Sequence, residues 1–260
     1  MYRNPRVYGN PPYSISVIHG GPGAPGQVAP IATELSKDFG VLEPFQTKPS
    51  ITNQIHELKD IIEISGTKPN ILIGHSYGAV LSYLVASKYP DFVERLILVA
   101  SPPFEAKFAT KIMDIRINRL KPDEKNEFYS VLSAINQKSF NLSIIEKFSQ
   151  LITKIDSFNP ITLDTGILKI EFDINQKIST EFEELRSSGK LIDLGKQITC
   201  PVFVIHGTYD PHPIEGILKP FMNVVAISDK KILTNCGHYP WLEVEAKAKF
   251  FKILKQFISQ

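Results

Sequence analysis

The chain has 260 residues, of which 43% are hydrophobic and 22% charged, values typical of a globular protein rather than a disordered one. Its formal net charge is +2, and no run of Lys or Arg adds a local basic patch, so we expect no nucleic-acid binding. Two cysteines, Cys200 and Cys236, do not make a disulfide framework.

Residues 1–10 are polar and lack the apolar core of a signal peptide. No apolar stretch approaches the length that a bilayer crossing requires. We therefore expect a cytoplasmic protein without a membrane span, whose partner is a small-molecule substrate.

Short apolar segments alternate with helical patterns along the chain, which predicts an α/β fold with a mostly parallel sheet flanked by helices. Several of these segments are apolar along their whole length, as in strands that are covered on both faces. Six are predicted as strands: Ser14–Ile18, Gly40–Leu42, Ile71–Ile73, Leu96–Ala100, Val202–Ile205 and Lys231–Leu233.

Three helices of this core are predicted from their apolar spacing. In the helix over Thr52–Ser65, one apolar face recurs at helical intervals and ends before Gly66. A second helix covers Tyr77–Tyr89 and ends before Pro90, and a third covers Val244–Ile258.

Residues 102–190 show helical patterns without an obvious buried strand: Lys111–Leu120, Asp123–Ile135, Leu142–Ile155 and Ser179–Ser187. We predict a core domain of residues 1–101 and 191–260, and a helical lid insertion of residues 102–190. Since ligands of open α/β sheets bind at the carboxyl ends of the strands, this insertion is expected to lie over the site. Its apolar residues are expected to line a substrate pocket, unless they pack only on one another: Ile112, Ile115, Leu120, Phe128, Leu132 and Ile135.

A candidate nucleophile lies in residues 74–78, which read Gly-His-Ser-Tyr-Gly and fit G-x-S-x-G. A buried strand precedes the motif and an amphipathic helix follows it. This is the strand–turn–helix setting in which a serine sits on a strained elbow with its hydroxyl exposed. We predict that Ser76 is the nucleophile rather than part of an ordinary turn.

Residues 19–23 read His-Gly-Gly-Pro-Gly and also follow a strand. Their small side chains leave backbone N–H groups free to face an anion. An oxyanion hole in such a fold combines one N–H of this loop with the N–H after the nucleophile. This predicts Gly21 and Tyr77 as the two donors.

The predicted acid and base follow in the order Ser, Asp, His. Asp210 lies just past the Val202–Ile205 strand, and His238 lies in a tight loop between Gly237 and Pro240. An Asp in this place can orient a histidine ring and stabilise its imidazolium. The other five histidines are not predicted to act in catalysis. None shows metal-ligand spacing with Cys or a carboxylate, so we expect no metal and no cofactor.

With these four elements in order, the chain resembles the α/β-hydrolase superfamily over residues 13–101 and 197–259. The resemblance implies a lid between two core strands. The N-terminal lead leaves little room for the first antiparallel hairpin that such folds usually have, so about six core strands are expected.

Within the superfamily, the loop of residues 19–23 is similar to that of the proline iminopeptidase group. That resemblance implies release of an N-terminal proline, with lid glutamates holding the free amine; the candidates are Glu105, Glu171, Glu181, Glu183 and Glu184. The elbow differs from the Gly-Gly-Ser-Trp-Gly of that group, and residues 237–243 are more similar to general esterases and C–C bond hydrolases.

The predicted function is a serine hydrolase that cleaves a small ester or amide through an acyl-enzyme. The alternatives are a proline iminopeptidase-type aminopeptidase, a C–C bond hydrolase with the same triad, and a non-enzymatic ligand-binding protein of this fold. Phe104, Tyr239 and Trp241 are the predicted substrate-binding aromatic residues.

Overall fold

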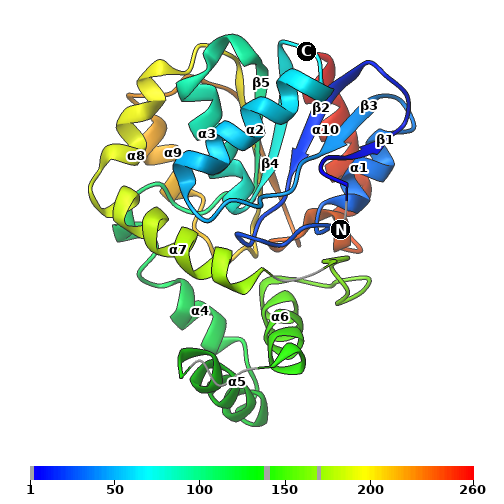
Figure 1. Cartoon of the computed structure of the whole chain (residues 1–260). Coiled ribbons are helices and arrows are strands. Elements are labelled where there is room, and N and C mark those ends of the chain that lie inside the picture. Colours follow the sequence, from blue (N-terminus) through cyan, green and yellow to red (C-terminus); the bar gives the residue numbers. More distant parts are fainter. Residues whose placement is uncertain (1–2, 138–140, 169–170) are drawn as a thin grey trace.

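A seven-stranded sheet forms the centre of the computed structural model, which describes residues 3–137, 141–168 and 171–260. The strand order is β1-β3-β2-β4-β5-β6-β7 (Figure 1). Strands β2 to β7 run parallel to one another, and β1 pairs with β3 in the antiparallel direction. The strands are β1 (Arg6–Tyr8), β2 (Tyr13–Ile18), β3 (Gly40–Glu43), β4 (Asn70–His75), β5 (Val93–Val99), β6 (Val202–Gly207) and β7 (Ile227–Leu233).

The predicted fold class is confirmed, since all six predicted strands are present and form the parallel part of the sheet. About six core strands were expected, and the sheet has a seventh, β1, which pairs with β3 rather than forming a hairpin with β2. Strand β1 is anchored by the fully buried carboxylate of Glu43, which accepts a hydrogen bond from Tyr8 (2.7 Å) and pairs with Arg6 (2.8 Å). Because its anchors are polar, β1 carries no apolar pattern in the sequence.

Helices cover both faces of the sheet, and the strand residues alternate between them. Ile71 and Ile73 face the layer that contains α1 (Ala29–Leu35) and α10 (Lys247–Ser259), whereas Leu72 faces the layer with α2, α3 and α9. These last three helices span Ile51–Ser65, Tyr77–Lys88 and Glu215–Phe221. The continuous apolar runs in the strands therefore reflect burial from two sides.

Residues 102–190, between β5 and β6, form most of the remaining helices. These are α4 (Ile112–Asn118), α5 (Pro122–Asn136), α6 (Leu142–Asp156), α7 (Phe172–Ser187) and, at the end of the segment, α8 (Lys190–Asp193). Figure 1 shows α4, α5 and α6 grouped away from the sheet, with α7 between this group and the core. Within the described ranges, no helix is long and apolar enough to cross a membrane.

Helices α4, α5 and α6 share a small apolar core of their own. Leu120 and Phe128 pack there against Leu151 and Ile155, with Leu132 at its edge. The expectation that Leu120, Phe128 and Leu132 line the substrate pocket is therefore wrong, because these side chains are used to hold the helices together.

Candidate active site

Ser76 occupies a sharp turn between β4 and α3. Its backbone angles are φ 53° and ψ −126°, a conformation that residues other than glycine rarely adopt. A Cβ atom on Gly78 would lie 2.3 Å from the carbonyl oxygen of Ile18, so only glycine fits where the helix passes β2. The Ser76 hydroxyl makes no hydrogen bond to any of the described residues, which leaves it available to a ligand.

The glycine-rich loop of residues 19–23 lies directly against this serine. A Cβ atom on Gly20 would come within 2.8 Å of the Ser76 Cβ. Two glutamines hold the loop. Gln27 accepts a hydrogen bond from the Gly20 N–H (2.9 Å), and Gln46 donates to the His19 carbonyl oxygen (2.6 Å).

Gly21 and Tyr77 both line the cavity in front of Ser76. Within the described part of the chain, neither backbone N–H donates to a protein acceptor. Tyr77 is buried, where an unpaired backbone N–H is rare, and Gly21 is exposed. Two free N–H groups at one cavity suit an oxyanion.

Asp210 and His238 form a buried pair beside the cavity. The Nδ1 of His238 donates to Oδ2 of Asp210 at 2.8 Å. Burial alone would raise the pKa of Asp210, but electrostatic interactions with the rings of His238, His212 and His206 hold this pKa well below its usual value. Asp210 is therefore an ionised acceptor that orients the His238 ring.

His212, which was not predicted as a catalytic residue, also contacts Asp210. Its Nδ1 donates to the other oxygen, Oδ1, at 2.7 Å, and its backbone N–H donates to the same atom at 2.9 Å. The His212 and His238 rings lie 4.6 Å apart, and both line the cavity. Burial lowers the pKa of His212 to about 4, against the opposing effect of Asp210. His212 is therefore neutral at pH 7.

The three side chains of Asp210, His212 and His238 also form a group with metal-ligand character, because one ligand atom from each lies within 4.8 Å of the others. The spacing of these residues in the sequence does not follow a metal motif, so the grouping was not predicted. Both histidines already use Nδ1 to bind the Asp210 carboxylate. The hydrogen bonds of the group are thus those of an Asp–His pair with a second histidine.

Two further histidines contact the loops that carry the site residues. His75 donates from Nε2 to the carbonyl oxygen of His238 at 2.9 Å, and its ring packs edge-on against Trp241. His19 accepts a hydrogen bond from the Gln46 backbone N–H at Nε2 (3.2 Å). Burial lowers the pKa of His19 to about 4 and that of His75 well below its usual value. Both rings are neutral structural groups.

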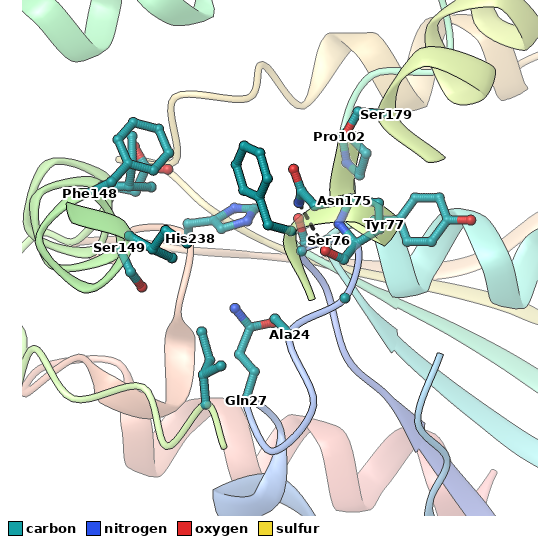
Figure 2. Close-up of a pocket in the computed structure, with 18 of the residues that line it drawn as sticks. Ala24, Gln27, Ser76, Tyr77, Pro102, Phe148, Ser149, Asn175, Ser179 and His238 are labelled. Atoms are coloured by element: carbon teal, nitrogen blue, oxygen red, sulfur yellow. Dashed lines mark hydrogen bonds between the residues drawn. The ribbon is translucent and has the colours of Figure 1, made fainter. Parts of the chain in front are cut away.

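A cavity of about 350 Å³ opens in front of these groups and is lined by Ser76, His238, Gly21 and Tyr77. Figure 2 shows the His238 side chain extending into it on the opposite side from Tyr77, with Ser76 between them. The predicted substrate-binding residue Tyr239 also lines it.

Phe104 and Trp241, by contrast, do not line this cavity. Phe104 is fully buried against Tyr83 and Phe221, and Trp241 packs on His75 and Phe250. Both predictions are corrected, because these rings complete the core beneath the site.

Apolar residues of the segment 102–190 form a wall of the cavity. Of the six apolar residues predicted to line the pocket, only Ile135 does so. The wall is completed by side chains of α6, α7 and the segment before α7: Ile145, Phe148, Ile152, Ile167, Phe172 and Phe182. The sequence of α6 shows an apolar face. It does not show which of its apolar residues line the cavity and which pack on α5.

The charged groups at the cavity are already paired. Arg116 of α4 binds Asp156 of α6 through two parallel hydrogen bonds of 2.8 and 2.5 Å. Asp156 is the one acidic residue among the described residues that line the cavity. The five glutamates proposed to hold an amine lie elsewhere; Glu181, for example, accepts from the Ile51 N–H at the start of α2 (2.7 Å).

Sequence reasoning missed several residues of the site: Gln27, Gln46, Arg116, Asp156, Asn175 and His212. Asn175 donates to the Pro22 carbonyl oxygen (2.9 Å), which ties α7 to the glycine-rich loop (Figure 2). Only His212 had a local signal, since an Asp two residues before it favours a side-chain-to-backbone turn. The others depend on contacts between distant parts of the chain.

Comparisons with known proteins agree with this architecture. A family model described as the alpha/beta hydrolase fold matches residues 46–239. The chain is 23% identical to proline iminopeptidase of Saccharolobus solfataricus over 277 residues, which cover 95% of this chain and 85% of that protein.

Two solved structures illustrate the likeness in three dimensions. Proline iminopeptidase of Mycobacterium smegmatis matches with a TM-score of 0.64 and 18% identity, over 98% of this chain and 94% of that one. The meta-cleavage product hydrolase of Pseudomonas fluorescens IP01 matches with a TM-score of 0.64 and 14% identity, over 98% and 93%. At these identities the structural likeness shows the fold alone.

Proposed function

Because the chain belongs to the alpha/beta hydrolase fold family, we propose that it is a serine hydrolase that cleaves a small ester or amide with Ser76, His238 and Asp210. The observation that carries the proposal is the Asp210–His238 pair, 2.8 Å apart, whose histidine lines the same cavity as a serine at φ 53°. A strained serine with a free hydroxyl beside an oriented imidazole suits nucleophilic catalysis.

In the proposed reaction, His238 takes the proton of the Ser76 hydroxyl as the oxygen attacks a carbonyl carbon. The N–H groups of Gly21 and Tyr77 stabilise the oxyanion, and ionised Asp210 stabilises the imidazolium. His238 then gives the proton to the leaving group, and water repeats the sequence on the acyl-enzyme. The hydrogen bond between Ser76 and His238 is expected to form when substrate binds, since such bonds are often long without it.

We further propose that residues 102–190 act as a lid over this site. The apolar wall of Ile145, Phe148 and Ile152 lies on the lid side of the cavity, which suits an apolar acyl group. With Asp156 paired to Arg116, the described lining offers no free carboxylate to hold an ammonium group. These features favour an uncharged ester.

A second candidate function is an aminopeptidase of the proline iminopeptidase type. It is favoured by the 23% identical relative and by the Gly-Gly-Pro-Gly loop beside Ser76. A panel of aminoacyl naphthylamides beside p-nitrophenyl esters separates the two. Turnover of prolyl naphthylamide above that of every ester would decide for the aminopeptidase.

The proposal is tested by labelling the protein with a fluorophosphonate, which reacts with activated serines. Ser76 of the wild type should be labelled and the label found on its tryptic peptide. Ser76→Ala should remain folded, take up no label and lose about 10⁴- to 10⁶-fold in kcat. Ester hydrolysis near the wild-type rate in Ser76→Ala would rule the function out.

A further inference from the structure

The two loops that carry Asp210 and His238 are bound to the lid by a set of buried and partly buried polar contacts. Asp156 is the last residue of α6, and its carbonyl oxygen accepts the backbone N–H of His238 at 2.7 Å. A Cβ atom on Gly237 would lie 2.1 Å from this same oxygen. The end of the lid thus contacts the histidine loop through the backbone itself.

Glu243 fastens this contact. Its carboxylate is fully buried and accepts the backbone N–H of Gly237 at 2.8 Å, beside His238. It also accepts the N–H groups of Phe158 (2.8 Å) and Asn159 (2.7 Å), just past the end of α6. Three hydrogen bonds to one buried carboxylate are strong, because each is charge-assisted.

Arg119 makes the corresponding contact for the acid loop. Its guanidinium donates to the Tyr209 carbonyl oxygen, next to Asp210, at 2.7 Å, and to the Ile155 carbonyl oxygen, next to Asp156, at 2.9 Å. It also lies 3.6 Å above the Tyr209 ring. Arg119 does not line the cavity in front of Ser76, so its contacts bear on the loops and not on substrate.

We propose that the lid holds the catalytic base and acid in register, with Glu243 and Arg119 as positioning residues that join their loops to the ends of α4 and α6. This inference rests on the function proposed above. It changes the role of the lid, which then supports the chemistry as well as selecting the substrate. A displacement of His238 by about 1 Å would be enough to lower the rate about 100-fold.

The test compares Glu243→Gln and Arg119→Gln with two controls. Glu245→Gln removes a nearby carboxylate that accepts a hydrogen bond from the Asn159 side chain. Lys111→Gln removes an exposed charge at the start of α4. The two positioning variants should lose about 10- to 100-fold in kcat and in the rate of fluorophosphonate labelling, with KM unchanged. The controls should keep the wild-type values of all three.

A second readout does not depend on turnover. The proton in the His238–Asp210 hydrogen bond should give a separate low-field NMR signal in the wild type, which shifts or broadens in both positioning variants and not in the controls. A folded variant at either position that keeps both the wild-type kcat and the wild-type signal overturns the inference. If Glu243→Gln does not fold, Arg119→Gln alone decides.

The two proposals fail in different ways. A wild-type protein that takes up no label and hydrolyses no substrate would count against the proposed function. In that case the NMR signal still decides whether Glu243 and Arg119 position the His238–Asp210 pair. Loss of activity that lies wholly in KM would also overturn the inference, because it would mean that the lid acts only on substrate binding.

Discussion

At the scale of single residues, Ser76 has a backbone conformation that is unfavourable for a residue with a side chain. Its φ of 53° costs about 1–3 kcal/mol for a residue with a side chain, and the strand and helix on either side hold it in place. The strain presents the hydroxyl to the cavity. Stability and activity therefore make opposite demands on this position.

This conflict predicts that Ser76→Gly is more stable than Ser76→Ala by about 1 kcal/mol. Glycine removes the backbone strain of the folded state. Its greater conformational entropy in the unfolded state offsets only part of that stabilisation. Urea unfolding of both inactive variants measures the difference. At Ser133, an exposed position inside α5, the same pair should show the opposite order, since glycine disfavours helices. An equal or lower stability of Ser76→Gly would mean that the elbow is not strained.

Asp210→Asn should fold normally and lose roughly 10⁴-fold in kcat, because His238 is then held in the wrong tautomer. Asp229 is the matched control. It lies on β7, where it pairs with Lys231 at 2.7 Å and makes no contact with His238. Steady-state ester kinetics of the two variants give the answer. Full activity in Asp210→Asn with loss in Asp229→Asn would overturn the assignment.

The residues of the predicted site could be found from the sequence to the extent that they sit in local patterns. Ser76 lies in a five-residue motif, and Asp210 and His238 follow strands in a fixed order. Tyr239 follows His238 directly, and it lines the cavity. Phe104 does not line it, and nothing local distinguishes an aromatic residue at a cavity from one that fills the core beneath it.

At the level of elements, α6 serves two partners. Leu151 and Ile155 pack on α5, Ile145 lines the cavity, and Phe148 and Ile152 do both. The helix therefore couples the small core of the lid to the surface that meets the substrate.

Ile152→Trp should narrow the cavity and lower kcat/KM for long-chain esters about tenfold relative to short-chain esters. Fluorophosphonate labelling of Ser76 should continue. Gln150→Trp places the same side chain on the exposed side of α6 and should leave the ranking unchanged. If Ile152→Trp also leaves it unchanged, substrate choice is made by the core side of the cavity.

Elements with a strong apolar period were predicted closely, and weakly patterned ones were not. Helix α2 begins and ends within one residue of its prediction, because four apolar residues recur on one face. Helix α9 was missed because it contains Pro220, which argues against a helix in the sequence. Helix α7 begins at Phe172 rather than Ser179, since its first apolar residues, Phe172 and Ile174, are two positions apart, which is not a helical spacing.

At the scale of the whole molecule, His19, His75 and His212 have pKa values lowered by burial, so these three rings carry no charge at pH 7. Each is protonated more easily in the unfolded chain, where its pKa is near 6.5, than in the folded protein. The unfolded state therefore binds more protons below that pH. Stability from these groups is fully present above pH 6.5 and is lost as the pH falls toward 4.

The free energy of unfolding should accordingly fall by about 2 kcal/mol for each of His19 and His212 between pH 6.5 and pH 5. Urea unfolding at several pH values measures this slope. Replacing the exposed histidine of α2, in His56→Gln, should leave the slope unchanged. A free energy that is flat across this range would mean that the buried rings are protonated in the folded state.

The hydrogen bonds of Glu243 to Gly237, Phe158 and Asn159, here called the Glu243 staple, determine where the lid could be exchanged for another. Residues 156–159 are continuous with the insertion in the chain, yet their backbone groups hold Gly237 and His238 in the core. A chimaera that replaces residues 102–190 as one block would lose the Glu243 staple, and a different backbone would then lie beside His238. A graft confined to residues 121–150 would keep Arg119, Asp156 and the contacts of Glu243. The functional seam between lid and core thus lies inside the insertion and not at its ends.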